Sequence, residues 1–159
     1  MRFTLIKNIH KERSMVVMLT ALLLSTLLYL GIDIFVKQSI LGVTQTTLSA
    51  TLFGDEQEFI EPISQASFLE YIHGEIFFMM MLLLTLSAAF IRVAKISFFA
   101  LLTLNINLIS ALLSLLFLAL AYFYSEIFVL LYLGSFFLWH ALSVLMSIYA
   151  LWRLHAKIL

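Results

Sequence analysis

Three side chains capable of acid–base or metal chemistry stand close together in the segment FLEYIHGEIFFMMMLLL, which runs from Phe68 to Leu84. Glu70 and His73 are three positions apart, so on a helix they share a face. This Glu-x-x-His spacing is the one that carboxylate-bridged di-metal bundles use, whereas Glu75 falls on another side of the helix. Glu70 and His73 are therefore candidate ligands of a divalent metal. The alternative is a polar collar where an apolar helix begins.

His140 lies within the apolar run FLWHALSVL and is the second candidate site. Together with His73 it could serve as an axial ligand of a haem. At a rise of about 1.5 Å per residue, His140 lies about 20 Å from Arg153 and His73 about 28 Å from Arg92. If both arginines mark one membrane edge, the offset of about 9 Å disfavours a single iron shared by the two histidines.

Polar side chains also recur along one face of each of two apolar segments. The first stripe consists of Thr103, Asn107, Ser110 and Ser114, and the second of His140, Ser143 and Ser147. Asn107 lies about 18 Å from Lys95, nearly level with His140. We therefore predict that the stripes face each other and that Asn107 and His140 are hydrogen-bonded or bridged by water. Such stripes typically hold helices together, but they could also line a pocket for a small ligand, a quinone or a proton.

The composition indicates whether these side chains lie in a soluble protein or in a membrane protein. Of the 159 residues, 64% are hydrophobic and 11% are charged, whereas soluble domains have about a quarter charged residues. The surplus of apolar side chains must face lipid, so the chain is an integral membrane protein. It contains no cysteine, which excludes disulfides and thiolate metal sites.

The charged residues divide the chain into four apolar stretches. Three are long enough, or nearly so, to cross a bilayer of about 30 Å, whereas the second is too short and its helix must extend backwards through Glu75. We predict an all-α fold, a single transmembrane domain over 1–159 built as a four-helix bundle. The helices are expected at about 15–34, 68–91, 97–124 and 126–152. The outer segment 35–66, about 32 residues long, is expected to carry short helices on the membrane surface.

The orientation follows from the distribution of lysine and arginine. With four spans, eight of the nine basic residues fall on one side and only Lys37 falls on the other. Basic residues are retained in the cytoplasm, so we predict both termini inside and the acid-rich segment 35–66 on the periplasmic side. The protein is then expected in the cell inner membrane.

No catalytic motif, phosphate loop or nucleic-acid signature accompanies these spans. We therefore expect a small non-enzymatic multi-pass protein, a subunit, assembly factor or accessory of a larger inner-membrane complex. Its partners would be the lipid bilayer and another membrane protein or further copies of itself. The first alternative is a redox subunit that binds haem or a divalent metal through His73, His140 and Glu70. The second is a small transporter or channel that acts as an oligomer.

Overall fold

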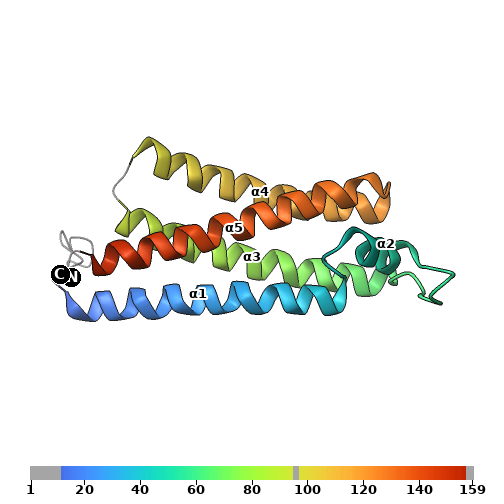
Figure 1. Ribbon diagram of the computed structural model, residues 1–159, viewed down its shortest axis with the longest axis horizontal. Helices are drawn as coiled ribbons and strands as arrows, with labels where there is room; N and C mark the ends of the chain where they lie inside the picture. Colours follow the sequence, from blue (N-terminus) through green and yellow to red (C-terminus); the bar gives the residue numbers. More distant parts are fainter. Residues whose placement is uncertain (1–11, 95–96, 157–159) are drawn as a thin grey trace.

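The computed structural model describes residues 12–94 and 97–156, and within them the fold is all-helical. The long helices lie side by side, and the short helix α2 lies at one end of the bundle (Figure 1). The long helices α1, α3, α4 and α5 are each long and apolar enough to cross a membrane, which confirms the predicted four spans. In chain order, the helices are α1 (Arg13–Ile40), α2 (Gln45–Phe53), α3 (Gln65–Val93), α4 (Phe98–Phe123) and α5 (Ile127–His155).

The first helix differs most from its predicted bounds. It was expected to end near residue 34, but α1 continues to Ile40 and carries Asp33 and Lys37 within it. The outer segment therefore occupies the stretch between Ile40 and Gln65 instead of 35–66. The physical reason is that Asp33 and Lys37 both find partners inside the bundle, so neither charge has to reach water.

The buried residues of α1 follow a regular spacing of three and four along the helix. This face consists of Val16, Leu19, Leu23, Thr26, Leu30, Asp33 and Lys37. A three-four spacing keeps one seam of a helix against its neighbours in an antiparallel bundle. Helix α5 lies at the centre of the arrangement and contacts α1, α3 and α4.

Small side chains line the contact between α4 and α5. Ala111 and Ser114 of α4 are buried, as are Ser143, Ser147 and Ala150 of α5. Lipid is as apolar as leucine, so helices in a membrane gain little from burying large side chains against each other. Close backbone approach over small residues and a few polar bonds therefore hold this pair together.

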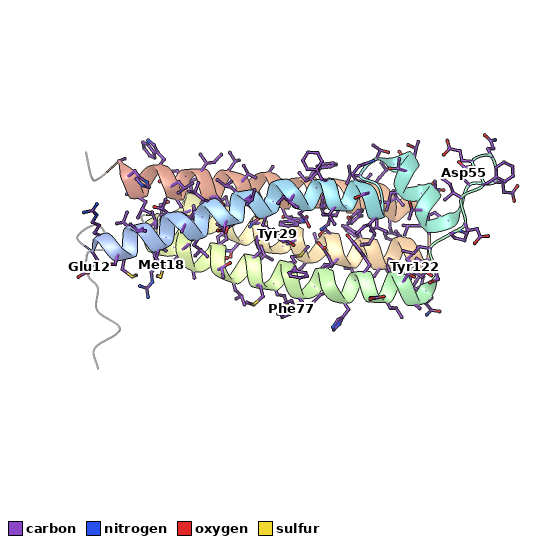
Figure 2. The ribbon with its side chains drawn as sticks, turned by 90° about the horizontal axis from the view of Figure 1, so that it is seen from below. Glu12, Met18, Tyr29, Asp55, Phe77 and Tyr122 are labelled. Carbon is purple, nitrogen blue, oxygen red and sulfur yellow. The ribbon has the colours of Figure 1, made fainter. Side chains whose placement is uncertain are left out.

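The outer surface of the bundle is apolar along its length. Phe77 of α3, Leu112 of α4 and Leu138 of α5 are all exposed, and Phe77 projects from the side of the bundle in Figure 2. In water such a surface would cause aggregation, whereas in hydrocarbon it costs nothing. The exposed apolar side chains thus form the lipid-facing surface of a multi-pass membrane protein.

Helix α2 covers one end of the bundle. It begins at a capping box in which Thr44 and Thr47 satisfy each other's backbone N–H groups. Its apolar face, Leu48 and Leu52, is buried against α4 and α5. The start of α1 and the end of α5 lie at the opposite end of the bundle (Figure 1).

Several residues on which the predicted orientation depends lie outside the described residues. They are Arg2, Lys7, Lys11, Lys95 and Lys157.

Candidate functional site

A cluster of four ionisable side chains lies inside the bundle, and we call it the charge cluster. It consists of Asp33 and Lys37 from α1, Glu75 from α3 and His140 from α5. Asp33 and Lys37 are one turn apart on the buried face of α1, so both point towards the neighbouring helices. Lys37 is 2% exposed, His140 3% and Asp33 8%. These three side chains therefore lie away from both lipid and water, while Glu75 is partly exposed.

Lys37 uses all three of its N–H donors within the cluster. Its Nζ donates to Asp33 Oδ1 at 3.0 Å, to Asp33 Oδ2 at 2.9 Å and to Glu75 Oε1 at 2.6 Å. Lys37 also lies in the last turn of α1, where the negative end of the helix dipole favours a cation. The ammonium group thus holds two carboxylates and joins α1 to α3.

His140 closes the cluster from α5. Its Nε2 atom lies 3.0 Å from Asp33 Oδ2, and its Nδ1 atom lies 3.1 Å from the carbonyl oxygen of Phe136. The rings of Phe136 and Trp139 flank the imidazole, with centroids 4.2 and 3.9 Å away. Lys37 Nζ lies 5.5 Å from the centre of the Phe136 ring. Aromatic faces attract cations, so the Phe136 ring supports the positive charge of Lys37.

Asn107 and His140 do not form the direct hydrogen bond that we expected between them. Asn107 instead pairs with Ser143: its Nδ2 donates to Ser143 Oγ at 3.1 Å, and Ser143 Oγ lies 3.2 Å from Asn107 Oδ1. Both ring nitrogens of His140 are occupied by Phe136 and Asp33. The sequence reasoning assigned no acid to the depth of His140 and therefore did not anticipate Asp33 as its partner.

The remaining stripe hydroxyls bond to the backbone of their own helices. Ser110 donates to the Asn107 carbonyl, Ser114 to Ala111 and Ser147 to Ser143. Thr103 does the same at Phe99 and is only partly buried. Backbone-bonded hydroxyls present no free donor to a ligand, so these serines serve close helix packing.

The structure does not bring Glu70 and His73 into the charge cluster. Both side chains are exposed, while Glu75 on the same helix turns inwards to Lys37. His73 and His140 therefore do not converge, since His140 is buried with both ring nitrogens engaged. Within the residues that the structure describes, no group of three or more His, Asp or Glu side chains is placed to hold a metal ion.

Sequence reasoning had not assigned a role to Asp33 or Lys37, although a signal was present. Both fall on the three-four spacing that begins at Val16, and the spacing continues through them without a break. A charged pair one turn apart on the buried seam of a spanning helix predicts partners from other helices. The cluster ties α1, α3 and α5 together and concentrates ionisable groups inside the membrane.

The Aq_1264_TM family model, described as a transmembrane helical domain, matches residues 42–157. No curated protein and no solved structure matches the chain. The matched range holds α2 to α5 with Glu75 and His140, and it begins after the α1 residues Asp33 and Lys37. Because the match covers more than half of the chain, the protein belongs to the Aq_1264_TM family of transmembrane helical domains.

Proposed function

We propose that this multi-pass membrane protein is a non-enzymatic subunit, assembly factor or accessory of a larger complex in the cell inner membrane. Its buried polar groups mostly bond to one another or to their own helices. They support a folded scaffold more directly than they support a reaction. The part of the described chain that offers unused side chains to another protein is the outer loop between α2 and α3.

The observation that carries this proposal is the conformation of Phe59 in that loop. Phe59 is 93% exposed and has a backbone φ of 55°, a left-handed conformation that costs a bulky residue about 1–3 kcal/mol. Asp55 and Ile60 exchange two backbone hydrogen bonds of 2.9 Å around it. An exposed aromatic side chain on a closed, strained turn is typical of a recognition surface.

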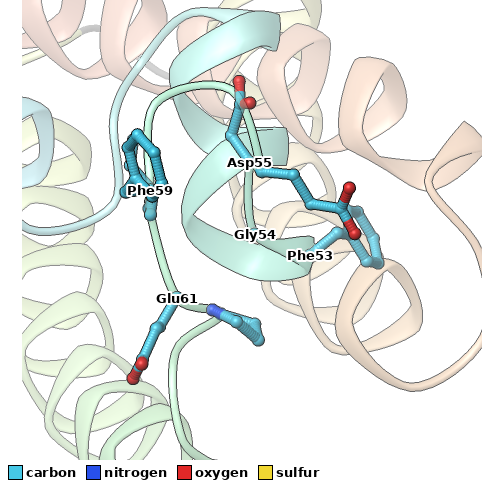
Figure 3. Close-up of a pocket in the computed structure, with 8 residues that line it drawn as sticks. Phe53, Gly54, Asp55, Phe59 and Glu61 are labelled. Atoms are coloured by element: carbon cyan, nitrogen blue, oxygen red, sulfur yellow. The ribbon is translucent and has the colours of Figure 1, made fainter.

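The charges around Phe59 indicate the chemistry of the partner. Acidic side chains surround it in the same loop, and no lysine or arginine occurs from residue 38 to residue 91. The loop encloses an open hollow of about 540 Å³, seen in Figure 3 between Phe53, Phe59 and Glu61. A fitting partner has an apolar socket for the ring and lysine or arginine at its rim. The acidic residues of the loop are Asp55, Glu56, Glu58 and Glu61.

The proposed orientation places both termini in the cytoplasm and this loop in the periplasm. Arg13 begins α1, and Arg92 and Arg153 lie in the last turns of α3 and α5. The loop that contains Asp55 projects from the end of the bundle opposite Glu12 (Figure 2). Because the chain has no cysteine, single cysteines can report the side directly. An impermeant thiol reagent on intact cells should label Glu56→Cys and leave His155→Cys unlabelled. The reverse pattern would overturn the orientation.

The docking proposal is tested by placing a photo-crosslinking amino acid at position 59 in cells. We expect an adduct with a second membrane-associated protein, and we expect it to weaken when the four loop carboxylates are replaced by their amides. A crosslinker at Leu112, which is exposed on the lipid-facing side of α4, is the matched control. If adducts formed only with a second copy of this chain, the partner would be the protein itself and the complex would be a homo-oligomer. No adduct from position 59 would contradict docking through this loop.

A second candidate function is favoured by the charge cluster itself. Ionisable residues inside spans commonly mark ion or proton pathways, so a small transporter acting as an oligomer is the alternative proposal. This alternative predicts that liposomes containing the purified protein show a flux of protons or other cations. If flux equals that of empty liposomes, and the chain is monomeric by mass, the transporter alternative is excluded.

A further inference from the structure

The two contacts of the His140 ring need one hydrogen more than a neutral imidazole beside an ionised carboxylate provides. Nδ1 faces the Phe136 carbonyl at 3.1 Å, and a carbonyl oxygen only accepts, so Nδ1 carries a hydrogen. Nε2 faces Asp33 Oδ2 at 3.0 Å, and an ionised carboxylate also only accepts. The contact therefore needs one further hydrogen, either on Nε2 or on Oδ2.

This additional proton also balances the charge of the cluster. Asp33 and Glu75 contribute two negative charges and Lys37 one positive charge, so the proton brings the sum to zero. Without it the cluster carries one uncompensated negative charge in a poorly polarisable interior, which is strongly unfavourable. Charge balance requires one proton without saying which carboxylate is involved, and the two contacts of His140 place it between Nε2 and Asp33 Oδ2.

We propose that the charge cluster is a proton-binding site that holds one exchangeable proton between Asp33 and His140 and thereby attaches α1 to α5. This inference goes beyond the docking role proposed above and does not depend on it. On release, the N–H or O–H bond breaks, the electron pair stays on Nε2 or Oδ2, and the proton passes to water as hydronium. Two lone pairs then face each other across 3.0 Å, and the contact between α1 and α5 becomes repulsive.

Glu75 is the member of the charge cluster through which a proton would most readily leave the bundle. Its side chain is 11% exposed, against 3% for Lys37 and 8% for Asp33, so it is the most accessible member of the cluster. Tyr71 lies one turn from Glu75 on the same helix, on the side of the outer loop. Its hydroxyl is buried and makes no hydrogen bond within the part of the chain that the structure describes.

Other groups near His140 also titrate, and a test must separate them. Helix α1 supplies Asp33, Lys37 and Tyr29, helix α3 supplies Glu75 and Tyr71, and helix α5 supplies Tyr132. Helix α2 has no titratable side chain, and α4 has none from Phe98 to Ala121. Replacing the imidazole alone therefore removes the proposed site while leaving every other titrating group in place.

The proton can be observed directly by NMR on the full-length chain in lipid nanodiscs. Histidine labelled with ¹⁵N in the ring, together with ¹³C-carboxyl aspartate, reports which atom of the Asp33–His140 contact is protonated. At neutral pH we expect either an imidazolium beside a carboxylate or a neutral imidazole beside a carboxylic acid. His140→Gln assigns the signal, and Glu70→Gln should leave it unchanged. A neutral imidazole beside an ionised Asp33, with its one hydrogen on either nitrogen, would overturn the proposal. This measurement is made on the wild-type chain and does not depend on the folding of a variant.

The attachment of α1 is tested by spin labels at Ser39→Cys in α1 and Ser135→Cys in α5. In the otherwise wild-type chain we expect the distribution of distances between the two spin labels to be narrow while the proton is bound. We expect this distribution to broaden when the pH is raised and the proton is removed. His140→Gln offers Asp33 an amide donor without a titratable charge, so its distribution should stay narrow throughout. If His140→Gln showed the same broadening, Lys37 or the tyrosines would be responsible and the proposal would fail. Constant width in both proteins would also overturn it.

Discussion

At the scale of single residues, the charge cluster should show the asymmetry of buried ion pairs. Removing one partner of such a pair leaves the other buried without compensation and costs about 3–5 kcal/mol. Lys37→Met removes the cation that faces both carboxylates while keeping a side chain of similar length. We expect it to lower the free energy of unfolding by about that amount, measured by denaturant titration in mixed micelles.

The matched control for Lys37→Met is Glu70→Gln, which also changes one charge but at an exposed position. Exposed substitutions of this kind usually change stability by less than about 0.5 kcal/mol. Adding Asp33→Asn and Glu75→Gln to Lys37→Met should recover part of the lost stability, because no uncompensated carboxylate then remains. Equal effects of Lys37→Met and Glu70→Gln would show that the cluster is solvated in the membrane.

The Asn107–Ser143 pair should contribute far less than the charge cluster. The two side chains bond only to each other between α4 and α5, and interhelical hydrogen bonds in membranes average about 0.6 kcal/mol and reach about 1.7. A double-mutant cycle with Asn107→Ala and Ser143→Ala should therefore give a coupling free energy within that range. A coupling of several kcal/mol would mean that the pair belongs to a larger polar network.

At the scale of elements, two glycines should respond to alanine in opposite directions. Gly42 joins α1 to α2 with a φ of +85°, and a Cβ there would collide with the Thr47 side chain. Gly134 lies within α5 with open space around its Cα. We expect Gly42→Ala to destabilise the protein by more than about 1 kcal/mol. Gly134→Ala should be neutral or stabilising, since alanine favours a helix by about 1 kcal/mol. Thermal unfolding of both variants checks the comparison, and a stabilising Gly42→Ala would contradict the left-handed turn.

The same elements show what the sequence could predict and where its information ended. The uncharged stretches predicted all four spans, the second after extension through Glu75. The three helices between Gln65 and His155 begin and end within three residues of the expected bounds. The rule that charged residues end a membrane span could not predict the end of α1. Asp33 and Lys37 remain inside this helix because His140 and Glu75 are their hydrogen-bond partners. Counting residues from the arginines does not place Asp33 level with His140 either. Asp33 is 20 residues from Arg13 but contacts His140, 13 residues from Arg153.

At the scale of the whole molecule, the exposed apolar surface is the feature that distinguishes a bilayer from any aqueous surrounding. Leu112 is 61% exposed near the middle of α4, and Tyr124 is 79% exposed at its end. An arginine at the centre of a spanning helix costs about 2.5–3.5 kcal/mol on insertion scales, whereas near the interface its side chain reaches water. Leu112→Arg should therefore reduce membrane insertion strongly and Tyr124→Arg little, measured by a glycosylation-based insertion assay of the α4–α5 hairpin. Leu112 is not part of the buried core, so a loss of insertion in Leu112→Arg cannot be attributed to lost packing. If the two variants inserted equally, this face of α4 would contact protein or water instead of lipid.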